Sequence, residues 1–172
     1  MEGKIETGVF RDLSYGLYVL TSLDEDILNG QIINSVSQVT NDPVRLAVTI
    51  NKKNMTHGLI LKSRVFAISV LGTSTPRSFF QLFGFMSGRD VNKLAQVKYK
   101  DGITGCPLIV ENAMSVVEAA VFKTIDLGTH TIFIGNVIYS EALAKGRSLT
   151  YRYYQEELNG RISENAPIYI PA

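Results

Sequence analysis

The sequence predicts a mainly β protein, an antiparallel β-barrel with short helices. Segments with the β-branched and aromatic composition or the two-residue alternation of strands outnumber the few short stretches with helical spacing. Turn sequences join most of these strands directly, as in hairpins. No strand–helix–strand unit repeats, which argues against a doubly wound parallel sheet and favours a barrel capped by a helix or two.

The strands are predicted in order from composition and alternation. They cover residues 15–22, 27–37, 44–50, 65–71, 107–110, 114–125 and 130–139. A polar turn at 24–26 joins the first two as a hairpin, and Asn41-Asp42-Pro43 is a turn signal before the third. The segment 65–71 is apolar on both faces, so we expect it at the centre of the sheet.

Short helices are predicted between the strands. Residues 8–14 form a helical turn, and Asn54 or Thr56 caps a helix that ends near Arg64. Pro76 stands in the first turn of another helix, which Gly84 breaks, and residues 90–94 form a further turn. The phenylalanines of the helix after Pro76 are interpreted as core residues, because they recur at helical spacing.

The composition fits a single domain over residues 1–172. Apolar residues make up 45% and charged residues 19%, which is enough to fill a core. The net charge of +1 provides no field to attract nucleic acid or an anionic membrane. No apolar run approaches the about 20 residues of a membrane span, and the N-terminus has no signal-peptide pattern, so we expect a cytoplasmic protein.

Several common motifs are absent. The chain has neither glycine-rich phosphate loop, G-x-G-x-x-G or G-x-x-x-x-G-K-[ST], and no H-E-x-x-H or G-x-S-x-G. Cys106 is the only cysteine and is interpreted as a small buried or loop residue. With His57 and His130 as the only histidines, we expect no metal site. Nothing in the sequence distinguishes NADH from NADPH.

Hydroxyl and amide side chains concentrate between Gly30 and Thr56, on both sides of the strand that starts at Val44. These groups, with a nearby lysine, can hold a phosphate without a metal. The same composition also suits a solvent-exposed sheet edge. The residues alone leave both interpretations open.

Several segments in order resemble the flavin reductase-like family. They are Gly30 to Thr40, Asp42-Pro43, Ile50 to Thr56, Phe66 to Leu71, Leu82 to Val91 and Gly128 to Gly135. Each is weakly specific alone, but their common order is specific, and the resemblance covers nearly the whole chain, about residues 8–140 well and the tail more loosely. The most similar branches are the flavoredoxins and the flavin domain of high-molecular-weight rubredoxins.

The resemblance implies an FMN-binding split β-barrel that forms a homodimer. It implies an oxidoreductase in which bound FMN takes a hydride from NADH or NADPH and passes electrons to free flavin, a ferric complex or a rubredoxin-type protein. The sequence has no pair of C-x-x-C motifs, so a rubredoxin-type acceptor is expected to be a separate molecule. A non-catalytic flavin- or haem-binding split barrel is the alternative.

The resemblance also supplies the candidate site residues. The flavin-binding candidates are Asn34, Ser35, Val36, Ser37, Gln38, Thr40, Asn51, Lys52, Asn54, Thr56 and Phe85. Lys52 is predicted to bind the phosphate beside a helix N-terminus, and Lys53 to point into solvent. His130 is the candidate catalytic residue, facing flavin and nicotinamide. The sequence leaves open which residues contact the phosphate and which the ring.

The tail is rich in tyrosine. We expect it to pack across the partner subunit of a homodimer, because a barrel of this size has no deep crevice of its own. The tyrosines concerned are Tyr151, Tyr153, Tyr154 and Tyr169.

Overall fold

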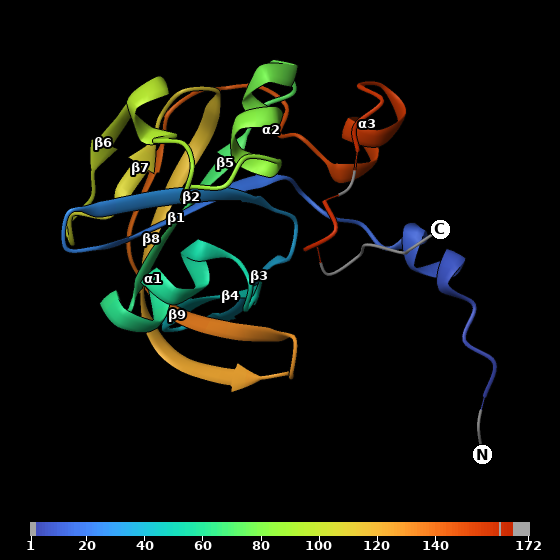
Figure 1. Cartoon of the computed structure of the whole chain (residues 1–172), viewed down its shortest axis with the longest axis horizontal. Coiled ribbons are helices and arrows are strands. Elements are labelled where there is room, and N and C mark those ends of the chain that lie inside the picture. Colours follow the sequence, from blue (N-terminus) through green and yellow to red (C-terminus); the bar gives the residue numbers. More distant parts are fainter. Residues whose placement is uncertain (1–2, 162, 167–172) are drawn as a thin grey trace.

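A computed structural model of the chain describes residues 3–161 and 163–166 (Figure 1). Its main element is a seven-stranded antiparallel sheet with the order β2-β1-β5-β8-β9-β4-β3. The strands are β1 (Tyr18–Asp24), β2 (Ile27–Ile33), β3 (Val36–Asn41), β4 (Val44–Asn51), β5 (Val65–Leu71), β8 (Ala113–Asp126) and β9 (His130–Ala142). The mainly β, antiparallel prediction is confirmed.

Shorter elements surround this sheet. They are the helices α1 (Met55–Ser63), α2 (Arg77–Gly84) and α3 (Tyr151–Glu156), the 3-10 turns η1 (Thr7–Asp12) and η2 (Leu94–Gln96), and the two-stranded sheet of β6 (Tyr99–Asp101) and β7 (Pro107–Ile109). None of the helices in residues 3–161 and 163–166 is long and apolar enough to cross a membrane.

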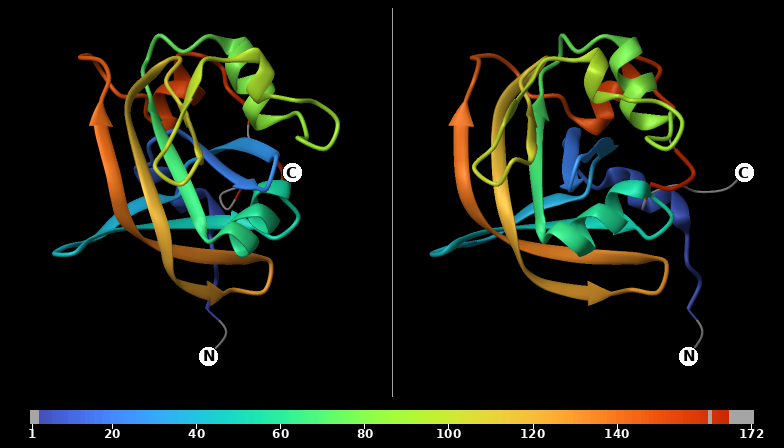
Figure 2. Two further views of the ribbon diagram at one scale, coloured as in Figure 1. Left: turned by 90° about the vertical axis from the view of Figure 1, so that its left-hand side faces the viewer. Right: turned by 60° about the vertical axis from the view of Figure 1, so that its left-hand side comes forward.

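The sheet is strongly curved, and its two edges are consecutive in the chain. β2 and β3 lie at opposite ends of the strand order, yet only Asn34 and Ser35 separate them. Ser35 bonds to β4 on crossing, since its Oγ donates to the Thr49 carbonyl at 3.0 Å. The long β8–β9 hairpin bends round the other side, with irregular register near Glu118 and Val121 (Figure 2). The result is a barrel in which β2 and β3 are not paired.

β1 separates two apolar cores. Leu20 faces the barrel interior, where it packs with residues such as Phe66 and Phe133. Val19 faces the opposite way, into a core that α2 and α3 cover. Figure 1 shows both helices on the same side of β1 and β2. This second core fixes α2, and therefore the loop that follows it, against β2.

Some boundaries differ from the prediction. The predicted strand 27–37 is two strands, because the chain crosses between sheet edges after Ile33. The turn predicted at 90–94 lies at Leu94–Gln96, and β6 was not predicted. In β8, Glu118 and Ala119 are both buried although they lie on opposite faces, because Ala119 packs in the barrel core and the Glu118 carboxylate accepts the backbone N–H groups of Ile103 and Thr104.

The tail tyrosines pack differently from the expectation. Tyr151 and Tyr154 are 8% and 7% exposed, within a core of their own chain. Tyr153 is partly buried against the same core. Packing across a partner subunit is therefore wrong for Tyr151 and Tyr154, whereas for Tyr153 it stays a prediction. Tyr169 lies outside the described residues.

Candidate functional site

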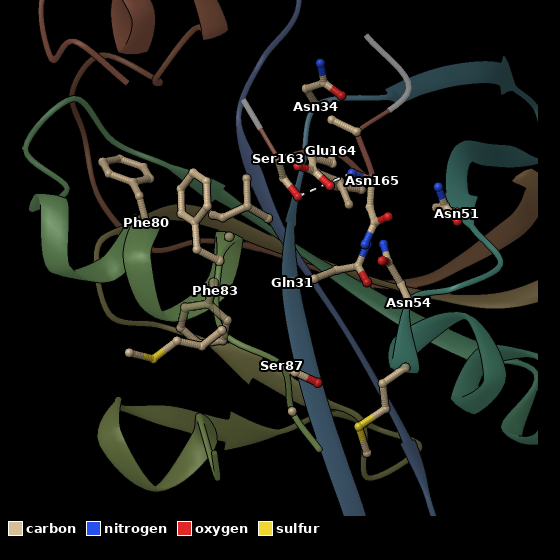
Figure 3. A pocket seen from close by; sticks show the side chains of 18 of the residues that line it. Gln31, Asn34, Asn51, Asn54, Phe80, Phe83, Ser87, Ser163, Glu164 and Asn165 are labelled. Carbon is tan, nitrogen blue, oxygen red and sulfur yellow. Dashed lines mark hydrogen bonds between the residues drawn. The ribbon is translucent and has the colours of Figure 1, made fainter. Parts of the chain in front are cut away.

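A cavity of about 540 Å³ follows strand β2. One wall comes from the end of β4 and the start of α1, and another from α2 and the loop after it. Arg161 and residues 163–166 also line it. Figure 3 shows Gln31 of β2 in the middle, with Ser87 toward one end and Asn34 toward the other. From Gly30 to Asn34 an extended chain covers about 13 Å.

At one end of the cavity, Asn29 and Gly30 of β2 contact the start of α1 and the loop after α2. The Asn29 amide nitrogen donates to the Thr56 hydroxyl of α1 at 2.8 Å. Gly88 lies so close to the Asn29 amide that a Cβ at this position would displace the Asn29 side chain. Lys93 donates from Nζ to the Gly30 carbonyl at 3.0 Å. Strand β2 thus holds both the start of α1 and the loop 85–93.

Amide side chains line the other part of the cavity. Asn34 is 4% exposed, and its Nδ2 has no hydrogen-bond partner among the described residues. Asn51 accepts the backbone N–H of Lys53 at 3.0 Å. Asn54 is the N-cap residue of α1, but its side chain makes no capping hydrogen bond. These amides can therefore still donate to and accept from a ligand.

An aromatic wall faces the amides. Phe80 and Tyr154 pack with ring centroids 4.8 Å apart, and both line the cavity. The Tyr151 hydroxyl is buried without a partner among the described residues, and burial raises its pKa. Phe85 and Met86 also line the cavity but are 50% and 41% exposed, which places them at its mouth.

The charged residues of the lining are mostly basic. Within residues 3–161 and 163–166 they are Lys53, Arg89, Lys93 and Arg161, against the single carboxylate of Glu164. Such a lining favours an anionic ligand. Lys93 differs from the other three because it is buried.

The structure brings together four of the predicted site residues. Asn34, Asn51, Asn54 and Phe85 all line the cavity. Thr56 does not line the cavity itself, but its hydroxyl accepts a hydrogen bond from Asn29, which does.

The other candidates lie outside the lining of this cavity. They are Ser35, Val36, Ser37, Gln38, Thr40, Lys52 and His130. On β3, Gln38 donates to the Thr40 carbonyl at 3.3 Å and the Thr40 hydroxyl donates to the Pro43 carbonyl. Their roles stay predictions.

The two neighbouring lysines point in different directions. Lys52 pairs with Asp126 at 2.6 Å, and this bond, with the Gly128 N–H, lowers the pKa of the Asp126 carboxyl. Lys53 is exposed, as expected, and it also lines the cavity. Of the two lysines, it is therefore Lys53 and not Lys52 that lines the cavity.

His130 lies next to the cavity rather than in its lining. It pairs with Asn51 across β4 and β9, and directly opposed residues of antiparallel strands present their side chains on one face. Its Nδ1 bonds to the Thr129 hydroxyl at 2.9 Å, and its Nε2 is buried without a partner among the described residues. His130 is therefore the neighbour of a cavity residue, Asn51, on the adjacent strand.

His57 has a structural environment. Its Nε2 bonds to the buried Thr131 hydroxyl at 2.8 Å, and its ring packs on Phe133. Burial is the main cause that lowers its pKa, and the Lys52 charge adds to the effect. The ring thus joins α1 to β9.

Sequence reasoning missed Gln31, Arg89 and Lys93 as cavity residues. Gln31 alternates on β2 with residues of the core, so its side could have been deduced from the strand period. No local signal identifies Lys93, because lysine is almost always a surface residue.

Comparison with known proteins places the chain among flavin enzymes. Residues 10–159 match the family described as flavin reductase like domain. The chain is 40% identical over 165 residues to a high molecular weight rubredoxin of Moorella thermoacetica. The matched region covers 96% of this chain and 72% of that protein. It is also 40% identical over 165 residues to a ferric-chelate reductase (NAD(P)H) of Archaeoglobus fulgidus, covering 96% and 98%.

A solved structure supports the fold. The FMN-binding protein from Thermus thermophilus with bound p-hydroxybenzaldehyde superposes with a TM-score of 0.76 and 26% identity, over 88% of each chain. The predicted split-barrel fold and family resemblance are thereby confirmed.

Proposed function

Because the chain belongs to the flavin reductase-like family, we propose that it binds FMN in the cavity along β2 and passes electrons from NAD(P)H to a second acceptor. The chain is an NAD(P)H:flavin oxidoreductase, as the sequence predicts. FMN rather than FAD, the position of the site and the acceptor belong to the proposal. The cavity along β2, with its amide side chains and its mostly basic charged side chains, is the observation that carries it.

The residues of the cavity fit a flavin phosphate. The volume lies within the range of about 300–1,000 Å³ that is usual for cofactor sites. Amides that both donate and accept suit the pyrimidine edge of an isoalloxazine ring. The buried Nδ2 of Asn34, without a protein acceptor among the described residues, supports a ligand at the amide end. The basic side chains suit a phosphate at the other end.

The two ends suggest different roles. Lys53, Ser87 and Arg89 would hold the phosphate near the start of α1, where unpaired helix N–H groups add donors. Asn34 and Asn51 would orient the ring, with His130 behind Asn51. When bound, the flavin supplies the centre that accepts a hydride from NAD(P)H and delivers electrons. The protein's residues position it and exclude water.

Phe85 and Met86 lie where a second substrate has to enter. Both are cavity residues with exposed side chains on the loop after α2. A flat apolar surface at the mouth suits the approach of a nicotinamide ring. We therefore assign Phe85 to the entrance of the site.

The acceptor is proposed from the relatives. One is named a high molecular weight rubredoxin and another a ferric-chelate reductase. A rubredoxin-type protein and a ferric complex are thus the first acceptors to test. A homodimer is also proposed, because Val44, Phe122 and Ile138 leave exposed apolar area on strands β4, β8 and β9.

Reconstitution tests the function directly. The purified protein is mixed with FMN and freed of excess flavin, and oxidation of NADH and of NADPH is followed with a ferric chelate as acceptor. We expect a yellow protein with turnover well above that of free FMN. A protein that stays colourless contradicts the proposal. FMN binding without turnover identifies the non-catalytic alternative.

A further inference from the structure

Lys93 is a buried lysine in the wall of the cavity. Its side chain is 3% exposed, and it follows the loop that carries Ser87 and Arg89. Among the described residues, its Nζ has one hydrogen-bond acceptor, the Gly30 carbonyl at 3.0 Å. The Phe83 ring centroid lies 5.9 Å from the same atom. An ammonium has three N–H donors, so the protein accounts for only part of its capacity.

The positive charge of Lys93 has no counter-ion in the described part of the chain. No carboxylate forms an ion pair with it there. Burial is the cause that lowers its pKa, to about 8. An uncompensated buried charge is unfavourable, whereas an apolar side chain of the same length would avoid that cost. A charge in this position is therefore expected to meet an anion other than the carboxylates of the described residues.

We propose that Lys93 binds the phosphate of the flavin and makes the site selective for FMN over riboflavin. The inference rests on the proposed function. Lys93 lies at the end of the cavity that Asn29 and Gly30 form, because its acceptor Gly30 adjoins Asn29, which holds Thr56 of α1 and packs on Gly88. A phosphate bound there would lie between the loop 85–93 and the start of α1.

The same hydrogen bond could serve only to hold the loop 85–93 on β2. β2 is paired on one side only, and Lys93 supplies a donor to one of its carbonyls. The two roles differ in a measurable way. A purely structural contact affects every flavin equally, whereas a phosphate contact affects FMN and leaves riboflavin unchanged.

The test compares the affinities of FMN and riboflavin for wild type, Lys93→Met and Lys93→Arg, by quenching of flavin fluorescence. Lys123→Met is the matched control, because Lys123 is an exposed lysine on β8 outside the cavity. We expect Lys93→Met to weaken FMN binding about 10- to 100-fold and riboflavin binding less than threefold. Lys93→Arg should keep most of the preference for FMN, and Lys123→Met all of it.

Several results would overturn the inference. Equal losses of FMN and riboflavin affinity would make Lys93 a structural residue, and unchanged FMN affinity would place the phosphate elsewhere. If wild type binds riboflavin as tightly as FMN, the site has no phosphate selectivity at all. Wild type that binds neither flavin is a separate result, because it removes the proposed function itself. Thermal unfolding of each variant verifies that it is folded.

Salt separates Lys93 from the exposed cations of the site. The contribution of a buried charge is screened much less than that of an exposed one. Raising the salt concentration to about 0.5 M should therefore reduce the effect of Lys53→Met on FMN affinity and preserve most of the effect of Lys93→Met. Equal screening of the two effects would contradict a buried contact with the phosphate.

Discussion

The polar residues on the two sides of the β2–β3 crossing have opposite environments. Asn34, at the end of β2, is buried at the cavity wall. Only six residues later, Thr40 lies on the opposite edge strand and uses its hydroxyl for the Pro43 carbonyl. In sequence the two belong to one polar stretch. The difference teaches that burial and convergence, rather than polarity alone, mark the candidate ligand contacts.

The largest expected effect concerns Lys93, the most deeply buried of the charged residues that line the cavity in the described part of the chain. Its pKa is lowered from 10.5 to about 8, so the unfolded state binds more protons between these values. The free energy of unfolding of the flavin-free protein should therefore rise with pH over this interval, by about 3 kcal/mol. Denaturant unfolding at several pH values measures it.

Lys93→Met provides the reference for this pH dependence. The variant lacks the titrating group. Its free energy of unfolding should therefore not show the rise of about 3 kcal/mol that Lys93 contributes to the wild type over this pH interval. The charged residues that share the cavity, Lys53, Arg89, Arg161 and Glu164, are unchanged in it. Parallel pH profiles for the two proteins would show that Lys93 has an ordinary pKa and is not a buried cation.

The next effect compares Asn34 with Thr40. Asn34→Leu should weaken FMN binding about 30-fold, corresponding to about 2 kcal/mol, because a hydrogen-bonding group of the cavity is lost. Thr40→Val should change it less than twofold. Isothermal titration gives both affinities. If Thr40→Val is the more damaging change, β3 forms part of the site as the sequence predicts, and the cavity along β2 is not the main contact.

His130, which lies outside the cavity lining, is expected to affect turnover more than FMN binding. His130→Ala should lower turnover with NAD(P)H about tenfold and change FMN affinity less than threefold, because Asn51 separates the ring from the cavity. Steady-state kinetics and FMN titration on the same sample measure the two quantities. The opposite pattern, weak FMN binding with normal turnover of the loaded protein, would make His130 a cofactor ligand.

The smallest effect separates Lys53 from Lys52. Lys53→Ala should weaken FMN binding about fivefold, near 1 kcal/mol, because an exposed charge contributes little to binding. Lys52→Ala should have almost no effect, since Lys52 pairs with Asp126. Titrations at low salt resolve a difference of this size. A larger loss for Lys52 would restore the assignment made from the sequence.

Many of the strands could be predicted from the sequence, because the alternation or apolar run that marks a strand lies within a few consecutive residues. The alternation from Val44 to Ile50 and the apolar run from Val65 to Leu71 are strands β4 and β5. The break between β2 and β3 could not be predicted, because Asn34 and Ser35 continue a β-like composition across a change of sheet edge. The place of the β3–β4 hairpin at the opposite edge depends on the pairing of β4 with β9, which is far away in the chain.

The candidate site could be predicted only in part for the same reason. The family resemblance identified Asn34, Asn51 and Asn54, which the fold then brings together. The choice between Lys52 and Lys53 depends on the direction of one turn before α1. Lys93 becomes a candidate only when the loop after α2 folds back on β2. Contacts between segments far apart in the chain decide these positions.

A crystal structure of the protein grown with FMN tests the central claim most directly. We expect flavin density along β2, with the phosphate near Lys53 and Lys93 and the ring near Asn34 and Asn51. Flavin bound against β3, with the cavity along β2 holding only water, would contradict it.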